Sequence, residues 1–171
     1  MIELAALSAA AAKRLGLWMC VSTLLVLASV NWGIYQKERL LAEGLDVRFE
    51  LAPVDPRSLM QGDYMALNYA MAGEVAARLA EGQTDGVLLV RLDADGVGQF
   101  DGLYLGQPLQ PAQLKVQFRL RHGLIKLASN AFFFEEGQGS HFAVAKFGEF
   151  KLKRNGELLL VSLLDENFVK L

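Results

Sequence analysis

The chain has 171 residues, a formal net charge of −2 and 53% hydrophobic residues, and this length suits one domain with an appendage. Seventeen Lys and Arg residues stand against nineteen Asp and Glu residues, which excludes a polycation that coats nucleic acid. One cysteine and the two histidines His122 and His141 exclude an internal disulfide framework and a multi-cysteine zinc site.

An uncharged segment lies near the N-terminus. No Asp, Glu, Lys or Arg occurs between Arg14 and Lys37. A helix over residues 15–35 is roughly 31 Å long, which is enough to cross the hydrocarbon core of a bilayer. We therefore expect a transmembrane helix over residues 15–36 that contacts lipid through residues 15–35, preceded by a cytoplasmic arm over residues 1–14.

Three other interpretations of this segment compete with a membrane anchor. A cleaved signal peptide has a shorter apolar region and a cleavage site of small residues, whereas Trp32 and Tyr35 close this apolar run. A buried core helix normally carries a polar stripe. A lipoprotein would require processing at Cys20, in the middle of the helix. The membrane anchor is the favoured interpretation.

The charges that flank the segment do not fix its orientation. Lys13 and Arg14 precede it, while Lys37, Arg39 and Arg48 follow it, so the positive-inside rule gives no decision. A short N-terminal arm before a single anchor commonly stays in the cytoplasm. We therefore expect a single-pass protein of the inner membrane whose C-terminal part is periplasmic.

The rest of the chain carries the pattern of short strands. We expect the helix to extend over residues 37–44 and to stop at Gly44. In residues 45–171 the period switches to two: residues 45–51 and 115–121 alternate between apolar and polar side chains, which is typical of half-buried strands. The expected strands cover residues 45–51, 64–69, 87–92, 98–104, 115–121, 124–127, 132–134, 149–153 and 157–163, and the expected short helices cover residues 73–80 and 140–146. The fold class is therefore mainly β (β-rich α+β): one N-terminal transmembrane helix, then an antiparallel β domain with one or two short helices.

Several local signals refine this pattern. Gly62-Asp63, His122-Gly123 and Asn155-Gly156 are expected turns, and an Asn-Gly pair tolerates the positive φ values of a type I′ turn. Ser140 is expected to cap the second short helix. The run of three phenylalanines over residues 132–134 predicts a buried strand or the end of one.

Residues 62–69 form the most specific motif, Gly-Asp-Tyr-Met-Ala-Leu-Asn-Tyr. This stretch resembles the signature of the bacterial GDYXXLXY protein family, because its five fixed positions are occupied by Gly62, Asp63, Tyr64, Leu67 and Tyr69. A second stretch, Glu136 to Gly139 after the phenylalanine run, is also similar to the family. The resemblance implies a membrane-anchored bacterial protein without an established activity. It also implies a multi-span membrane protein as a partner.

The motif also has a direct physical interpretation. Gly62 permits a tight turn, and the Asp63 carboxylate can accept backbone N–H groups. In the strand that follows, side chains alternate between two faces, so Tyr64 and Tyr69 point to opposite sides. We expect one tyrosine to fill the core with its hydroxyl hydrogen-bonded and the other to lie at the surface. A turn and strand that specify the fold are favoured over a binding or catalytic role.

One candidate for catalysis lies just before the motif. The segment from Ser58 to Asp63 resembles, loosely, the serine region of type I signal peptidases. A Ser–Lys dyad needs a lysine within hydrogen-bonding distance of the hydroxyl, and Lys115, Lys126 and Lys146 are the available partners. None of these lysines lies in a matching motif, and Ser58 is more simply a turn residue.

The loop formed by Glu135, Glu136, Gly137 and Gly139 is a second candidate. Paired carboxylates can hold a cation or perform acid–base chemistry, and His141 lies beside them. Adjacent glutamates in a strand point to opposite faces, however, so a solvated acidic loop is the favoured interpretation. No catalytic residue, cofactor or metal is expected here or elsewhere.

Charge is distributed unevenly along the chain. Residues 38–114 carry five basic and twelve acidic groups, whereas residues 115–154 carry eight basic and three acidic groups. Lys115, Arg119 and Arg121 share a strand face, and Lys151 and Lys153 share another. Neighbouring strands would form a basic patch for lipid phosphates or an acidic partner, although an exposed face kept soluble by charge is the simpler interpretation. No interleaved aromatic set suggests nucleic-acid binding.

These observations favour a non-enzymatic accessory module of the bacterial envelope that binds a membrane partner, and no nucleic acid. An envelope serine hydrolase that uses Ser58 and a lysine is the alternative. A small-ligand or peptide binder with a cleft near Tyr64 and the Glu135–Gly139 loop is a third possibility.

Overall fold

The computed structural model describes residues 2–52, 57–59, 62–129 and 131–171, and it describes side chains over residues 13–52, 64–129 and 131–171. The chain forms two compact units, Met1–Arg39 and Leu40–Leu171. The first unit is helical, and the second contains all the described strands.

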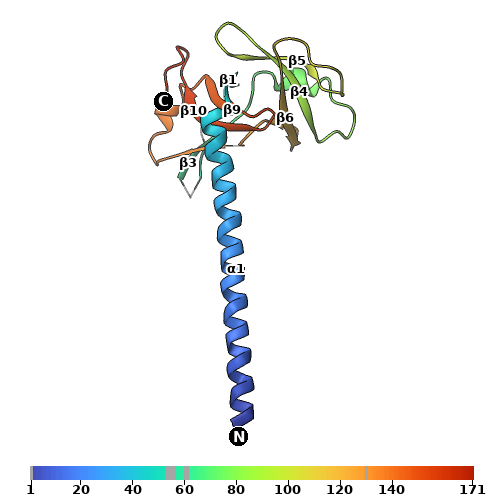
Figure 1. Ribbon diagram of the computed structural model, residues 1–171. Coiled ribbons are helices and arrows are strands. Elements are labelled where there is room, and N and C mark those ends of the chain that lie inside the picture. The colour runs from blue at the N-terminus through green and yellow to red at the C-terminus, as the bar shows by residue number, and fades with distance from the viewer. Residues whose placement is uncertain (1, 53–56, 60–61, 130) are drawn as a thin grey trace. The chain divides into compact units, whose positions relative to one another are not determined.

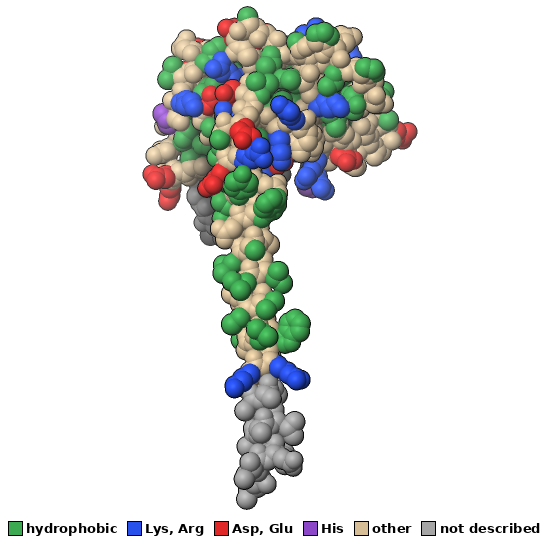
Figure 2. All heavy atoms as spheres, viewed as in Figure 1, with side chains coloured by type: hydrophobic (Ala, Val, Ile, Leu, Met, Phe, Trp, Pro, Cys, Tyr) green, Lys and Arg blue, Asp and Glu red, His purple; other side chains and the backbone are tan. Residues whose placement is uncertain are grey.

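The first unit belongs to one long helix, α1 (Ile2–Glu43) (Figure 1). Its segment Lys13–Glu43 is long and apolar enough to cross a membrane, a property that membrane anchors share with signal sequences. Figure 2 shows hydrophobic side chains along this helix. The hydroxyls of Ser22 and Thr23 donate hydrogen bonds to the carbonyl of Met19 at 2.9 Å, which satisfies these polar groups within the helix.

Gly44 follows the last residue of α1. Its backbone N–H donates to the carbonyl of Leu40 at 2.9 Å. A Cβ atom at this position would lie 2.5 Å from that oxygen and 2.9 Å from the Cβ of Lys151. Gly44 therefore ends the helix at a point where a larger residue has no room.

The second unit consists of short antiparallel strands in three sheets, with the strand orders β1-β9-β10, β2-β3-β8 and β5-β4-β6-β7. The strands are β1 (Leu45–Glu50), β2 (Arg57–Leu59), β3 (Gly62–Ala66), β4 (Asp85–Leu92), β5 (Gly98–Leu103), β6 (Gln113–Arg121), β7 (Leu124–Lys126), β8 (Ala131–Phe134), β9 (Phe147–Leu152) and β10 (Leu158–Leu164). Two short helices, α2 (Ala72–Ala76) and α3 (Gly139–Phe142), complete the unit. The expected fold class, an antiparallel β-rich body after an N-terminal apolar helix, is confirmed.

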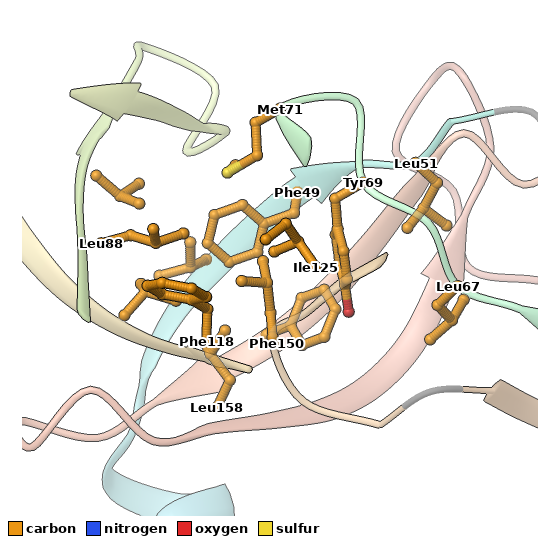
Figure 3. Close-up of a cluster of buried hydrophobic side chains, with 14 of the residues drawn as sticks. Phe49, Leu51, Leu67, Tyr69, Met71, Leu88, Phe118, Ile125, Phe150 and Leu158 are labelled. Carbon is orange, nitrogen blue, oxygen red and sulfur yellow. The ribbon is translucent and has the colours of Figure 1, made fainter. Parts of the chain in front are cut away.

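One hydrophobic core collects side chains from all three sheets, and Figure 3 shows members from the β1-β9-β10 and β5-β4-β6-β7 sheets. Phe49 of β1 and Phe150 of β9 are fully buried, and their ring centroids lie 5.6 Å apart. Phe118 of β6 and Met65 of β3 belong to the same cluster. Because burying one large apolar side chain contributes about 1.5–3 kcal/mol, this shared core holds the three sheets together.

Both short helices differ from the expected ranges. The helix α2 ends at Ala76 rather than Ala80. Beyond this end, the guanidinium of Arg78 lies 5.5 Å from the ring centroid of Phe100. The helix α3 covers Gly139–Phe142 with Gln138 as its N-cap, so the helix expected over residues 140–146 and its Ser140 cap were wrong. Phe142 is buried against the phenylalanines of β8, and this contact fixes the end of the single turn.

The turns at His122-Gly123 and Asn155-Gly156 differ in geometry. His122 and Gly123 both have positive φ, 51° and 74°, which is the requirement of a type I′ turn between β6 and β7. Between β9 and β10 only Gly156 has positive φ, so the type I′ turn expected at Asn155 is wrong. The reason is loop length, because the N–H of Gly156 donates to the carbonyl of Lys153 and closes a four-residue turn.

Gly98 of β5 offers a test of the core packing. A Cβ atom there would lie 2.5 Å from Cε1 of Phe49 and 2.8 Å from Cγ1 of Val90. We expect Gly98→Ala to lower the free energy of unfolding by about 1–3 kcal/mol because it overpacks the core. Gly73 of α2 has no atom within 4 Å of the corresponding position, so Gly73→Ala should be neutral or stabilising by about 0.5–1 kcal/mol. Denaturant unfolding measures both, and equal effects would contradict this packing.

Glu149 of β9 gives the fold a pH dependence. Burial raises the pKa of this carboxyl, but hydrogen bonds from Lys170 at 2.7 Å and Ser162 at 3.0 Å outweigh burial and lower it overall. A carboxylate whose pKa is lower in the folded state stabilises the fold above its unfolded pKa, and this stabilisation is lost as the pH falls through the folded value.

We therefore expect Glu149→Gln to flatten the loss of stability between about pH 5 and pH 3. Thermal unfolding at a series of pH values measures this slope. Glu166→Gln is the matched control, because the Glu166–Lys146 pair is well exposed on both sides and such pairs contribute little. A slope that both variants change equally would show that Glu149 has no special role.

Candidate functional site

The motif over residues 62–69 begins in β3, the central strand of the β2-β3-β8 sheet, which is called the small sheet below. In β3, Asp63 pairs with Ser58 of β2 on one side and with Phe134 of β8 on the other. Leu59 pairs with Gly62, so Gly62 and Asp63 already belong to the strand and the turn expected at these two residues is wrong. The side chain of Asp63 lies outside the described residues.

The alternation expected along the motif is confirmed, even though β3 ends at Ala66 rather than at Tyr69. Met65, Leu67 and Tyr69 are buried, with exposed fractions of 6%, 0% and 1%, whereas Tyr64 is only half-buried. The two motif tyrosines therefore point to opposite sides.

Tyr69 fills the centre of the core (Figure 3). Its ring packs edge-on against Phe49, with centroids 6.4 Å apart, and lies 6.2 Å from the ring of Phe150. The Tyr69 hydroxyl has no hydrogen-bond partner among the described residues, so the hydrogen bond expected for the core tyrosine is absent from this part of the chain. Burial raises the pKa of Tyr69, and the backbone of Ala128, which lies near the hydroxyl without meeting the geometry of a hydrogen bond, lowers it by less.

The end of the motif connects two sheets. Tyr69 forms an antiparallel bridge with Leu51, just after β1. The N–H of Ala52 donates to the carbonyl of Asn68 at 2.9 Å, and the N–H of Ala70 donates to that of Glu50 at 3.0 Å. The motif thus leaves the small sheet and pairs beside the β1-β9-β10 sheet.

The outward tyrosine belongs to an aromatic pair. Tyr64 pairs with Phe133 across β3 and β8, and their ring centroids lie 5.9 Å apart. Phe133 is 73% exposed, so the expectation that all three phenylalanines of residues 132–134 are buried is wrong. Strand alternation explains it, because Phe132 and Phe134 turn toward Phe142, with centroids 5.1 and 4.8 Å from it. The same alternation was readable in the sequence.

The Glu135–Gly139 loop follows β8 directly. Glu135 and Glu136 are exposed, and Gly137 has a φ of 85°. The side-chain amide of Gln138 donates to the Glu135 carboxylate at 3.4 Å. Among the described residues, no three His, Cys, Asp or Glu side chains come together as metal ligands.

Two clefts lie in the surface of this unit. One of about 600 Å³ is lined by Met65, Ala66, Lys146 and Glu166, among others. The other, of about 650 Å³, lies along β6 and is lined by charged residues. Neither of these two clefts is lined by Tyr64 or by the Glu135–Gly139 loop, so the expected ligand cleft near those residues stays a prediction.

The three candidate partners of Ser58 have other contacts. Lys115 places Nζ 3.7 Å from the ring centroid of Tyr104. Lys126 donates to the carbonyl of Leu67 at 3.4 Å, and Lys146 lies 2.9 Å from the Glu166 carboxylate. The side chain of Ser58 lies outside the described residues, and the Ser–Lys dyad stays a prediction.

Comparison with known proteins gives one match. A family model described as "GDYXXLXY protein" matches residues 26–163, most of the chain. No curated protein and no solved structure matches.

The buried hydroxyl of Tyr69 provides a test of what the motif does. A phenol oxygen without a partner in the core costs free energy. We therefore expect Tyr69→Phe to leave the free energy of unfolding unchanged or to raise it by up to about 1 kcal/mol, whereas Tyr69→Ala should lower it by about 3–5 kcal/mol. Chemical denaturation measures both changes. A loss above about 2 kcal/mol for Tyr69→Phe would show that the hydroxyl has a bound partner.

Proposed function

The chain belongs to the GDYXXLXY protein family, and from this premise we propose that it is a non-enzymatic accessory protein that binds a membrane protein partner. It is held in the inner membrane of a bacterium by α1, with its β-rich unit in the periplasm. The partner is a multi-span membrane protein. The observation that carries the proposal is the aromatic pair of the half-buried Tyr64 and the exposed Phe133, at the motif that names the family.

The anchor rests on the composition of α1. The segment Lys13–Glu43 has the length and hydropathy of a membrane-spanning helix. Trp32 and Tyr35 are exposed, with ring centroids 6.1 Å apart, and amphipathic rings of this kind favour the interface between lipid and water. These features support an uncleaved anchor.

The aromatic pair has the chemistry of a protein-binding surface. Aromatic side chains are enriched where protein surfaces bury each other, and a few of them supply most of the binding energy. An isolated apolar side chain at a surface needs no explanation, but Phe133 lies beside the ring of a motif tyrosine in a paired strand. A rigid sheet presents both rings without the entropy cost of ordering a loop.

The non-enzymatic part of the proposal rests on the candidate lysines. Each has a neighbour that accounts for its position: the Tyr104 ring, the Leu67 carbonyl and the Glu166 carboxylate. A serine becomes a nucleophile only with an adjacent base. These contacts support a binding role for the unit.

The test is co-purification of the full-length chain from host membranes in mild detergent, with the partner identified by mass spectrometry. We expect Phe133→Ser to reduce recovery of the partner at least tenfold, since loss of a central aromatic contact commonly costs about 2 kcal/mol or more. The thermal unfolding midpoint should stay near that of the wild type, because Phe133 is exposed.

Leu105→Ser is the matched control, because Leu105 is 85% exposed and lies outside the aromatic pair. It should leave recovery unchanged. If the wild-type chain is recovered as a clean monomer, or if both variants lose the partner equally, the proposal fails.

A further inference from the structure

The cleft along β6 contains a cluster of positive charges. Arg119 and Arg121 of β6 and Lys126 of β7 line it, together with Ser129 and the carboxylates of Asp85 and Glu157. Arg119 and Arg121 are two residues apart in one strand, so their side chains leave the same face of the sheet. The type I′ turn at His122-Gly123 then sets the register of β7 beside them.

This register places like charges opposite each other. Arg119 pairs directly with Lys126 across β6 and β7. Like charges at directly opposed positions of a sheet destabilise it. Arg119 also pairs with Asp85 across β6 and β4, but the charged atoms of these two side chains do not come within 4.0 Å of each other.

The cluster forms no ion pair with a described carboxylate, unlike five other cations of the same unit. These five cations are matched with carboxylates at 2.7 to 4.0 Å: Arg91–Asp101, Lys146–Glu166, Lys151–Asp46, Lys153–Glu157 and Lys170–Glu149. No described carboxylate forms such a pair with Arg119, Arg121 or Lys126. Glu157 is the second acid of the cleft, and its carboxylate is already shared with Lys153.

Lys126 is the most enclosed member of the cluster. Its Nζ donates to the carbonyl of Leu67 at 3.4 Å, a long contact for a charged donor. Burial lowers the pKa of this ammonium group, because no nearby negative charge offsets the loss of water. Among the side chains of the cluster, Lys126 therefore gains most from a bound anion.

We propose that this cleft binds a phosphate-type anion through Arg119, Arg121 and Lys126. With Lys153, which pairs with Glu157, four cations stand against the two cleft carboxylates Asp85 and Glu157, and this leaves an excess of two positive charges. A phosphomonoester carries about that much negative charge near neutral pH. The planar guanidinium groups provide paired donors for its oxygens, and the ammonium group adds a point charge.

Two sources share this chemistry, the headgroup of a phospholipid and a soluble phosphomonoester. The exposed Leu124 at the β6–β7 turn, 44% accessible, adds an apolar group next to the cations, and a lipid surface accepts such a combination. The site itself is defined by the phosphate chemistry, and it lies on a different sheet from the Tyr64–Phe133 pair. A failure of the proposed phosphate binding can therefore be distinguished from a failure of the proposed partner binding.

The experiment uses the full-length chain in a neutral detergent, with inorganic phosphate and glycerol 3-phosphate as probes at constant ionic strength. Calorimetry measures the dissociation constant, and thermal unfolding measures the stabilisation by bound ligand. We expect the double variant Arg119→Gln and Arg121→Gln to weaken binding at least tenfold. Without phosphate its unfolding midpoint should be unchanged or higher, because the opposed charges of Arg119 and Lys126 have been removed.

The matched control is Lys146→Gln with Lys170→Gln, which removes the same net charge outside the cleft and should keep the affinity of the wild type. If neither probe binds the wild type, if chloride competes as well as phosphate, or if both double variants lose binding equally, the proposal is overturned.

A soluble short-chain phosphatidic acid then distinguishes the two sources. Binding at least tenfold tighter than that of glycerol 3-phosphate assigns the site to lipid headgroups, whereas equal affinity assigns it to free phosphomonoesters. Loss of both in the Arg119 and Arg121 variant is expected in either case, and retention of either one would overturn the role of these arginines.

Discussion

The burial of Tyr69 between Phe49 and Phe150 is the contact on which the rest of the β-rich unit depends. It brings the end of the motif, which starts in the small sheet, against the core face of the β1-β9-β10 sheet. The bridge to Leu51 and the two flanking backbone hydrogen bonds hold that position. Since side chains alternate along an extended chain, placing Tyr69 inside forces Tyr64 to the other side. The surface aromatic pair is thus a geometric consequence of the core.

This arrangement gives the motif two roles in one segment. Its inward residues fix how two sheets pack, and their conformation sets the direction of the outward ones. If the motif only specified the fold, a smaller residue would serve equally well at position 64, because the core does not need the ring of Tyr64. The contact of the Tyr64 ring with the exposed Phe133 is therefore the part of the motif that core packing does not explain.

Local patterns allowed the strands and the opposite orientation of the two tyrosines to be predicted, because alternation depends only on neighbouring residues. The same rule, applied to three successive phenylalanines, would have placed Phe133 outside. Turn type was less accessible, since Asn155-Gly156 lies in a four-residue turn whose length depends on the pairing of β9 with β10. The charged cleft was not predictable as a whole. It needs the approach of Gly156 to Gln117 of β6, whose N–H donates to the Gly156 carbonyl at 2.8 Å, and this contact joins residues far apart in the chain.

The two proposed surfaces share one physical property, which is that each departs from an arrangement common in the rest of the unit. Large side chains of the unit mostly enter the core, yet Phe133 does not. Several of its cations have carboxylate partners, yet Arg119, Arg121 and Lys126 have none among the described residues. Both departures reduce stability, by exposing apolar area in one case and by opposing like charges in the other. A fold retains such costs where an external group offsets them. An apolar protein surface would do so for the rings, and a doubly charged anion would do so for the cleft.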